Sequence, residues 1–138
     1  MEDLFKRLGV LTILVIIFIF SSQNAEISSN VSNSFYREIS SFVKIDFLKQ
    51  YIRKLAHVTE YLALYFAVVF CLTNQEMKFP KAYLFVVLSA SLDEFHQTFV
   101  NGRCGSVNDV LIDSFLPLII TLISLCFYKY KVKNLYLF

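Results

Sequence analysis

The sequence is poor in the residues that build phosphate-binding loops, zinc sites and basic nucleic-acid interfaces. Only three glycines, three cysteines and two histidines occur among 138 residues. The absence of a glycine-rich loop argues against nucleotide chemistry. The cysteines form no C-x-x-C pair, so neither a zinc knuckle nor a redox motif is indicated, and no metal or cofactor is expected. The net charge of +2 gives no reason to expect a nucleic-acid partner.

Apolar residues, by contrast, are abundant and clustered. They make up 57% of the chain, and charged residues make up 17%. A soluble domain has about 45–50% apolar and about 25% charged residues. The run Leu8–Phe20 contains no charge at all. We therefore expect a membrane protein, and the length fits a single small domain that comprises residues 1–138.

Four apolar stretches are predicted to be transmembrane helices, because each approaches the roughly 20 residues that a span requires. They cover residues of about 4–22, 55–73, 80–99 and 107–128. No small-x-small cleavage site follows the first stretch, so we expect a retained helix rather than a signal peptide. Pro117 should kink the fourth helix, because it cannot donate a hydrogen bond to the carbonyl of Asp113.

An amphipathic helix is predicted between the first and second spans, over residues of about 34–45. Phe35, Ile39, Phe42 and Val43 recur at helical spacing, and charged side chains take the other face. Such a helix is typical of segments that lie on a membrane surface. A helix packed on its own protein is the alternative. The expected fold is thus an all-α membrane protein with four transmembrane helices and one interfacial helix.

Ionisable side chains interrupt the predicted spans at ends that should meet at one membrane face. They occur at the start of the second span, the end of the third and the start of the fourth, and successive spans run in opposite directions. Charged groups at membrane depth cost roughly 2.5–3.5 kcal/mol each, so they normally face a protein interior or a water-filled cavity. The expected ligand-binding site comprises Arg53, His57, Glu60, Tyr61, Asp93, Glu94, Gln97, Arg103, Asp109 and Asp113. His96 points roughly 100° away from Gln97 and is expected outside this cluster.

Several roles are compatible with this cluster. Arg53 and Arg103 could fork onto a phosphate or carboxylate, so that the pocket binds a polar lipid or cell-envelope head group. An alternative is a membrane-embedded lipid hydrolase or transferase with His57 as general base. Its candidate catalytic residues are His57, Glu60, Asp93 and Glu94. An accessory protein that acts through a partner is a third reading. A polar network that only holds the helices together is the fourth, at roughly 0.6 kcal/mol per hydrogen bond.

The basic residues near the predicted span ends indicate the orientation. Lys129, Lys131 and Lys133 follow the last span closely. Because basic residues favour the cytoplasmic side, these lysines predict cytoplasmic termini. Four spans place both termini on the same side. The polar cluster then lies at the outer membrane face.

Four polar motifs follow one another along the chain. They are Arg53-Lys-Leu-Ala-His57-x-x-Glu60-Tyr61, Asp93-Glu94-x-His96-Gln97, Gly102-Arg103 and Asp109-x-x-x-Asp113. Together, and with Ser21-Ser22-Gln23 after the first span, they resemble the VanZ-like family of small bacterial membrane proteins. The resemblance implies a multi-pass inner-membrane protein related to one that lowers susceptibility to the glycopeptide teicoplanin, and no settled biochemical activity. The antibiotic itself joins the candidate ligands. The family usually has a Gly/Ala pair soon after the position of Asp113, where this chain has Leu116-Pro117.

Overall fold

The chain folds into helices throughout the part that the structure describes. The structure is a computed structural model, and it describes residues 1–40, 48–73, 75 and 77–135. The helices are α1 (Glu2–Ser21), α2 (Ala25–Ser40), α3 (Leu48–Cys71), α4 (Lys78–Gln97) and α5 (Val107–Leu135). No strand occurs among these residues. The expected all-α fold class is confirmed.

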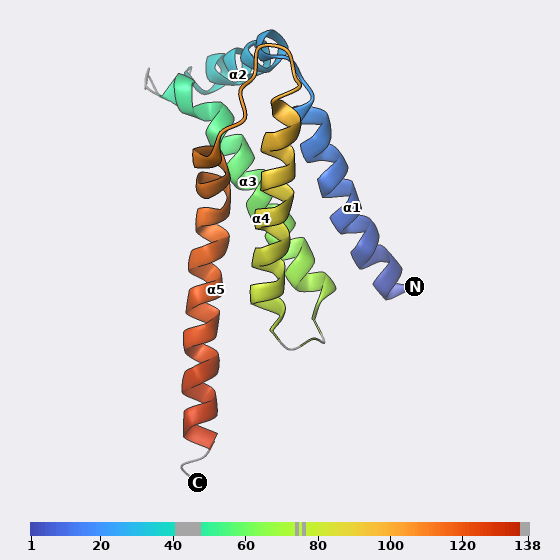
Figure 1. Cartoon of the computed structure of the whole chain (residues 1–138), viewed down its shortest axis with the longest axis vertical. Helices are drawn as coiled ribbons and strands as arrows, with labels where there is room; N and C mark the ends of the chain where they lie inside the picture. Colours follow the sequence, from blue (N-terminus) through green and yellow to red (C-terminus); the bar gives the residue numbers. More distant parts are fainter. Residues whose placement is uncertain (41–47, 74, 76, 136–138) are drawn as a thin grey trace.

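The four longer helices run up and down beside one another, and α2 lies across one end of them (Figure 1). The start of α1 and the end of α5 lie away from that end. α3 is the central element, because it contacts each of the other four helices, while α4 and α5 pack on each other. The end covered by α2 therefore gathers the end of α1, the start of α3, the end of α4 and the start of α5.

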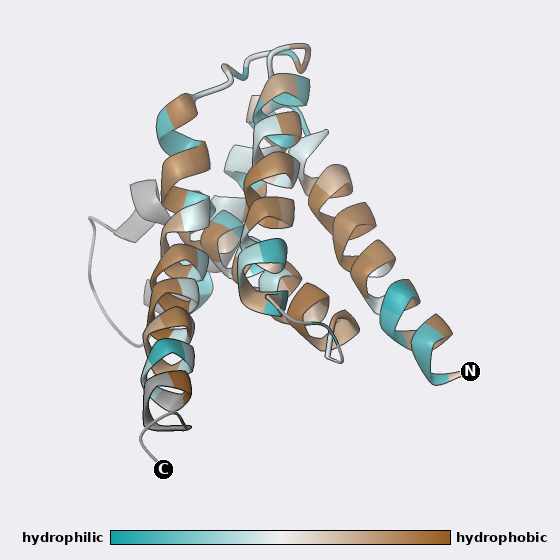
Figure 2. Cartoon of the chain, turned by 60° about the horizontal axis from the view of Figure 1, so that its bottom comes forward, coloured by the Kyte–Doolittle hydropathy of each residue, from teal (hydrophilic) through white to brown (hydrophobic). Residues whose placement is uncertain are grey.

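Three of the helices are long and apolar enough to cross a membrane within the part of the chain that is described. They are Glu2–Ser21, Ile52–Cys71 and Val107–Tyr130. α4 is as long as α1 but does not meet the same criterion. It carries Lys78 and Lys81 at its start and Asp93 and Glu94 at its end. Large apolar side chains are exposed along most of α1 and α5. Figure 2 shows the hydrophobic residues of these helices in brown.

The core of the bundle lies between α3 and α4. Tyr61, Leu64 and Tyr65 of α3 are fully buried there. The facing positions of α4 are small or medium-sized and recur every four residues, which lets the two helices approach closely. These positions are Ala82, Val86 and Ala90. The Tyr65 hydroxyl extends the contact to α5 through a 2.8 Å hydrogen bond with Thr121.

Two predicted helix boundaries need correction. α2 begins at Ala25, nine residues before the expected start at 34, because Asn24 caps it: its Oδ1 accepts a 2.8 Å hydrogen bond from the Ile27 N–H. The serine- and asparagine-rich stretch that follows is helical. Residues 41–45 of the predicted interfacial helix lie outside the described residues. α5 continues through Pro117 to Leu135, beyond the expected end at 128.

Candidate functional site

The structure brings all ten predicted site residues together at the end of the bundle that α2 covers. His57 of α3 interacts electrostatically with Asp93 of α4, Arg103 of the α4–α5 connection and Asp109 of α5. Asp113 likewise interacts with the other four carboxylates of the predicted set, which are Glu60, Asp93, Glu94 and Asp109. The convergence predicted from alternating helix directions is therefore present in the fold.

One half of the cluster is a closed network between α4 and α5. The Gln97 side-chain amide donates to Asp93 Oδ2 at 3.0 Å and to Glu94 Oε1 at 3.1 Å. The other Glu94 oxygen, Oε2, accepts a 2.8 Å bond from the Ser106 N–H, just before α5 begins. All three side chains are buried. Glu94 thus fixes the start of α5, because that N–H would otherwise have no helical partner.

Close packing of the α4–α5 connection supports this network. Gly105 lies against the end of α4, and a Cβ at this position would collide with the Glu94 carbonyl oxygen. Farther out, Lys54 Nζ of α3 binds Asp109 Oδ1 of α5 at 2.9 Å in a partly exposed ion pair. A small polar crevice of about 20 Å³ lies among these groups. It is lined by Arg53, Lys54, His57, Glu94, Gln97, Asp109, Ile112 and Asp113.

Arg103 connects three segments that are distant in sequence. Its Nη1 donates to the Ser21 carbonyl at the end of α1, and its Nη2 donates to Ser28 Oγ of α2, both at 3.0 Å. Its Nε is buried and has no hydrogen-bond partner among the described residues. Burial lowers the pKa of the Arg103 guanidinium from its usual value, and the positive charge of Arg53 adds to this effect.

Arg103 also has a role in the fold, because both of its terminal nitrogens donate to the protein itself. The connection that carries it is docked on α2, where the Ala25 N–H donates to the Asn101 carbonyl at 3.3 Å. Gly102 follows with φ of 75°, a conformation that glycine adopts without strain.

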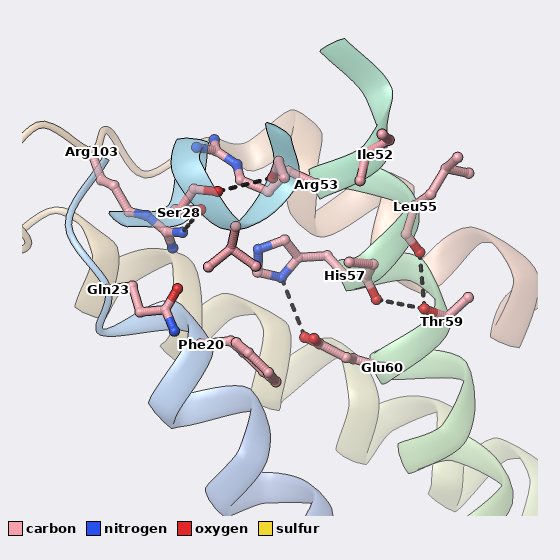
Figure 3. A pocket seen from close by; sticks show the side chains of 13 residues that line it. Phe20, Gln23, Ser28, Ile52, Arg53, Leu55, His57, Thr59, Glu60 and Arg103 are labelled. Carbon is pink, nitrogen blue, oxygen red and sulfur yellow. Dashed lines mark hydrogen bonds and ion pairs between the residues drawn. The ribbon is translucent and has the colours of Figure 1, made fainter. Parts of the chain in front are cut away.

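A cavity of about 410 Å³ lies between the end of α1, α2 and the first turns of α3 (Figure 3). Figure 3 shows His57 and Glu60 on one side of it and Arg103 and Gln23 on the other. Apolar atoms, including the carbon atoms of polar side chains, make most of its wall. The lining residues are Phe20, Gln23, Ser28, Val31, Ser32, Ile52, Arg53, Leu55, Ala56, His57, Thr59, Glu60 and Arg103. Arg53 and His57 line both this cavity and the polar crevice.

The polar groups of the cavity are less well paired than those of the network. His57 Nδ1 lies 3.8 Å from Glu60 Oε2, one turn apart on α3, which is too long for a hydrogen bond. Both atoms are buried and lack a hydrogen-bond partner in the described part of the chain. Five buried side-chain nitrogen or oxygen atoms in the described part of the chain have no hydrogen-bond partner. Three of them are His57 Nδ1, Glu60 Oε2 and Arg103 Nε, and all three residues line the cavity. The others are Ser21 Oγ and Tyr61 Oη.

Several predicted residues lie apart from the cavity. Asp93, Glu94, Gln97, Asp109 and Asp113 surround the α4–α5 side, and Tyr61 is buried among the carboxylates of Asp93, Glu94 and Asp113. No group of three or more histidine, cysteine or acidic side chains in the described ranges is placed to hold a metal ion.

His96 lies outside the cluster, as expected. Its Nε2 is 3.2 Å from Ser22 Oγ, and its ring packs on Phe18 of α1 at a centroid distance of 4.8 Å.

Sequence reasoning missed the contributions of α1 and α2. Gln23, Ser28 and Ser32 precede the predicted start of the interfacial helix and are not among the predicted site residues, yet they line the cavity. The available signal was the Ser21-Ser22-Gln23 motif, whose first residue supplies the carbonyl that Arg103 binds.

Comparison with known proteins identifies the family of this chain. The VanZ/LLP1 family model matches residues 8–128, a range that includes every residue lining the cavity and the crevice. No curated protein matches the chain, and no solved structure does. Because the family model covers most of the chain, the protein belongs to the VanZ/LLP1 family.

Proposed function

We propose that this membrane protein binds the polar head group of a membrane lipid or cell-envelope lipid intermediate in the cavity between α1, α2 and α3. The observation that carries the proposal is the pairing of apolar walls with unpartnered buried polar atoms of His57, Glu60 and Arg103. Buried polar atoms without partners call for an explanation, and ligand sites combine apolar walls with a few such groups. An amphiphile would satisfy both features.

The charges favour a head group that contains an anion. Arg53 and Arg103 are close enough for their positive charges to interact unfavourably. A phosphate or carboxylate beside them would relieve that repulsion. Glu60 would accept a hydrogen bond from a hydroxyl or ammonium group of the same ligand. The proposed ligand is thus an anionic lipid whose head group also carries a donor.

In the proposed membrane arrangement α1, α3, α4 and α5 all cross the bacterial inner membrane as one domain, and α2 lies at the interface. The charges of α4 support its inclusion, because they lie at its two ends and Asp93 and Glu94 are buried by protein. The termini would be cytoplasmic and the cavity would open at the outer face. Cys104 is exposed in the α4–α5 connection. A variant that retains only this cysteine should react with an impermeant maleimide added to intact cells.

Lipid binding is tested with the purified full chain in nanodiscs of defined composition. Arg53 is suited to the test because it is exposed and lines the cavity. Arg53→Ala should weaken binding of phosphatidylglycerol about tenfold, the effect of roughly 1.4 kcal/mol. Arg7→Ala, an exposed arginine at the other end of α1, is the control. Equal affinity of Arg53→Ala and wild type would contradict the proposal.

We further propose that head-group binding underlies a role in teicoplanin resistance, in keeping with the family relationship. Wild type and Arg53→Ala are expressed at matched membrane levels in a sensitive Gram-positive host. Protection by wild type and its loss in the variant are expected. Equal protection by both would separate resistance from this cavity.

A further inference from the structure

We infer that the cavity also hydrolyses its ligand: it cleaves a carboxylic ester of the bound lipid with water, and His57 acts as the general base. The inference rests on the proposed lipid binding and adds a reaction to it. Three features of the cavity support it, namely a histidine–carboxylate pair, a fixed cationic donor on the facing side, and its depth in the membrane.

The first feature is the pair His57 and Glu60. The two side chains are one helical turn apart on α3, and both are largely buried. A carboxylate beside Nδ1 favours the tautomer that carries its proton there, which leaves Nε2 as the basic nitrogen. Figure 3 shows the imidazole pointing into the cavity with Nδ1 towards Glu60. The separation of 3.8 Å is of the kind that shortens when substrate binds.

The second feature is the fixed position of Arg103. Its hydrogen bonds to the Ser21 carbonyl and Ser28 Oγ hold the guanidinium in place from two helices. Its Nε has no partner among the described residues, and the side chain lines the cavity opposite His57. A donor that is already oriented stabilises an oxyanion without reorganising during the reaction.

The third feature is depth. His57 is five residues beyond Ile52, where the candidate span begins, and therefore about 7–8 Å along the helix axis. A span of about 20 residues matches the roughly 30 Å hydrocarbon core, so Ile52 marks the boundary of that core and His57 lies inside it. The ester groups of glycerolipids lie at this boundary, and the cavity extends inward from it, because its lining on α3 runs from Ile52 to Glu60. The apolar side chains of Phe20, Val31 and Leu55 would then contact the acyl chain.

The reaction balances with water as the second substrate. The water oxygen attacks the ester carbonyl carbon while its proton passes to His57 Nε2, and Arg103 stabilises the resulting oxyanion. The bond between the carbonyl carbon and the alcohol oxygen then breaks, and that oxygen takes the proton from the imidazolium. The products are a fatty acid and a lysolipid. Glu60 is a positioning residue.

A covalent serine intermediate is not part of the proposal. Both cavity serines are engaged, since Ser28 Oγ accepts a bond from Arg103 and Ser32 Oγ donates to the Ser28 carbonyl.

The test uses the purified full chain in vesicles of phosphatidylglycerol with ester-linked palmitoyl and oleoyl chains, or of its ether-linked analogue. Fatty acid release is measured by mass spectrometry, and binding of the ether analogue is measured in parallel. Wild type should release fatty acid from the ester vesicles only. His57→Ala should lower the rate at least about a hundredfold, in the range expected for loss of a general base. His96→Ala is the matched control, because this second histidine lies outside the site.

The two proposals fail in different ways. Absence of release by wild type, or equal release by His57→Ala, overturns the hydrolysis, while retained binding of the ether analogue leaves the lipid-binding proposal standing. If the wild-type protein does not bind the ether-linked analogue, both the lipid-binding proposal and the hydrolysis are overturned. Thermal unfolding checks that each variant folds, and His57→Gln provides a second base-free variant. Glu60→Gln should lower kcat at least tenfold, a larger effect than the change in KM that follows from its contact with the head group, and an unchanged kcat would remove Glu60 from the mechanism.

Discussion

The polar crevice and the cavity share Arg53 and His57, yet their polar groups are paired very differently. On the crevice side, Gln97 bridges Asp93 and Glu94, Glu94 holds the Ser106 N–H, and Lys54 binds Asp109. On the cavity side, polar atoms of His57, Glu60 and Arg103 are left without partners among the described residues. From this comparison we infer that the two sides of the polar cluster have different roles. The crevice side holds the helices together, and the cavity side is the proposed ligand-binding site.

If this division is correct, substitutions on the crevice side should change stability most. Glu94→Ala removes the acceptor of the Ser106 N–H and one partner of Gln97. Each buried group left unpaired costs about 1–3 kcal/mol, so the two groups together should cost about 2–6 kcal/mol. Unfolding of the purified protein in detergent measures the effect. A variant that unfolds like wild type would assign Glu94 to the ligand rather than to the scaffold.

Gly105→Ala is expected to have the next largest effect. The added Cβ would collide with the Glu94 carbonyl and lie 2.7 Å from Thr98 Cγ2, so the α4–α5 connection must move. Overpacking of this kind costs about 1–3 kcal/mol. Gly9→Ala is the matched control, since nothing lies within 4 Å of a Cβ there. The stability of the two variants is compared by the same unfolding assay, and equal values would show that the connection is loosely packed.

Gln23→Ala tests the cavity side, where a substitution should change ligand affinity more than stability. The side chain lines the cavity and points into it beside Arg103 (Figure 3). Loss of one hydrogen bond to a ligand is worth about 0.5–1.5 kcal/mol, so lipid affinity should fall about twofold to tenfold. The free energy of unfolding without lipid should change by less than about 0.5 kcal/mol, as is usual for substitutions that remove no internal contact. A large loss of stability with unchanged affinity would erase the distinction between the two sides.

The smallest effect is expected for Lys54→Ala. The Lys54–Asp109 ion pair belongs to the crevice side but is partly exposed. Exposed ion pairs contribute about 0–1 kcal/mol and weaken as salt is added. Unfolding measured at low and high salt should therefore differ less in this variant than in wild type. An identical salt dependence would show that the pair adds nothing to stability.

The sequence predicted the clustering of polar residues much better than it predicted the cavity. The convergence of α3, α4 and α5 followed from helix direction and the positions of residues such as His57, Asp93 and Asp113. The cavity depends on contacts that no local pattern reveals: Arg103 binds Ser21 and Ser28, 82 and 75 positions away. The predicted start of the interfacial helix at 34 was also wrong, because the cap at Asn24 outweighed the low helix propensity of the serines that follow.

The position of Arg103 in the chain determines when the cavity is completed during synthesis of the protein. The other lining residues of the cavity all precede residue 61, whereas Arg103, which links α1 to α2, comes later. A ribosome adds about 5–20 residues per second, so roughly 4–16 s separate the synthesis of Ser21 from that of Arg103. During this interval the nascent chain lacks the guanidinium. The cavity is therefore completed late in biogenesis, only after all of α4 has been translated.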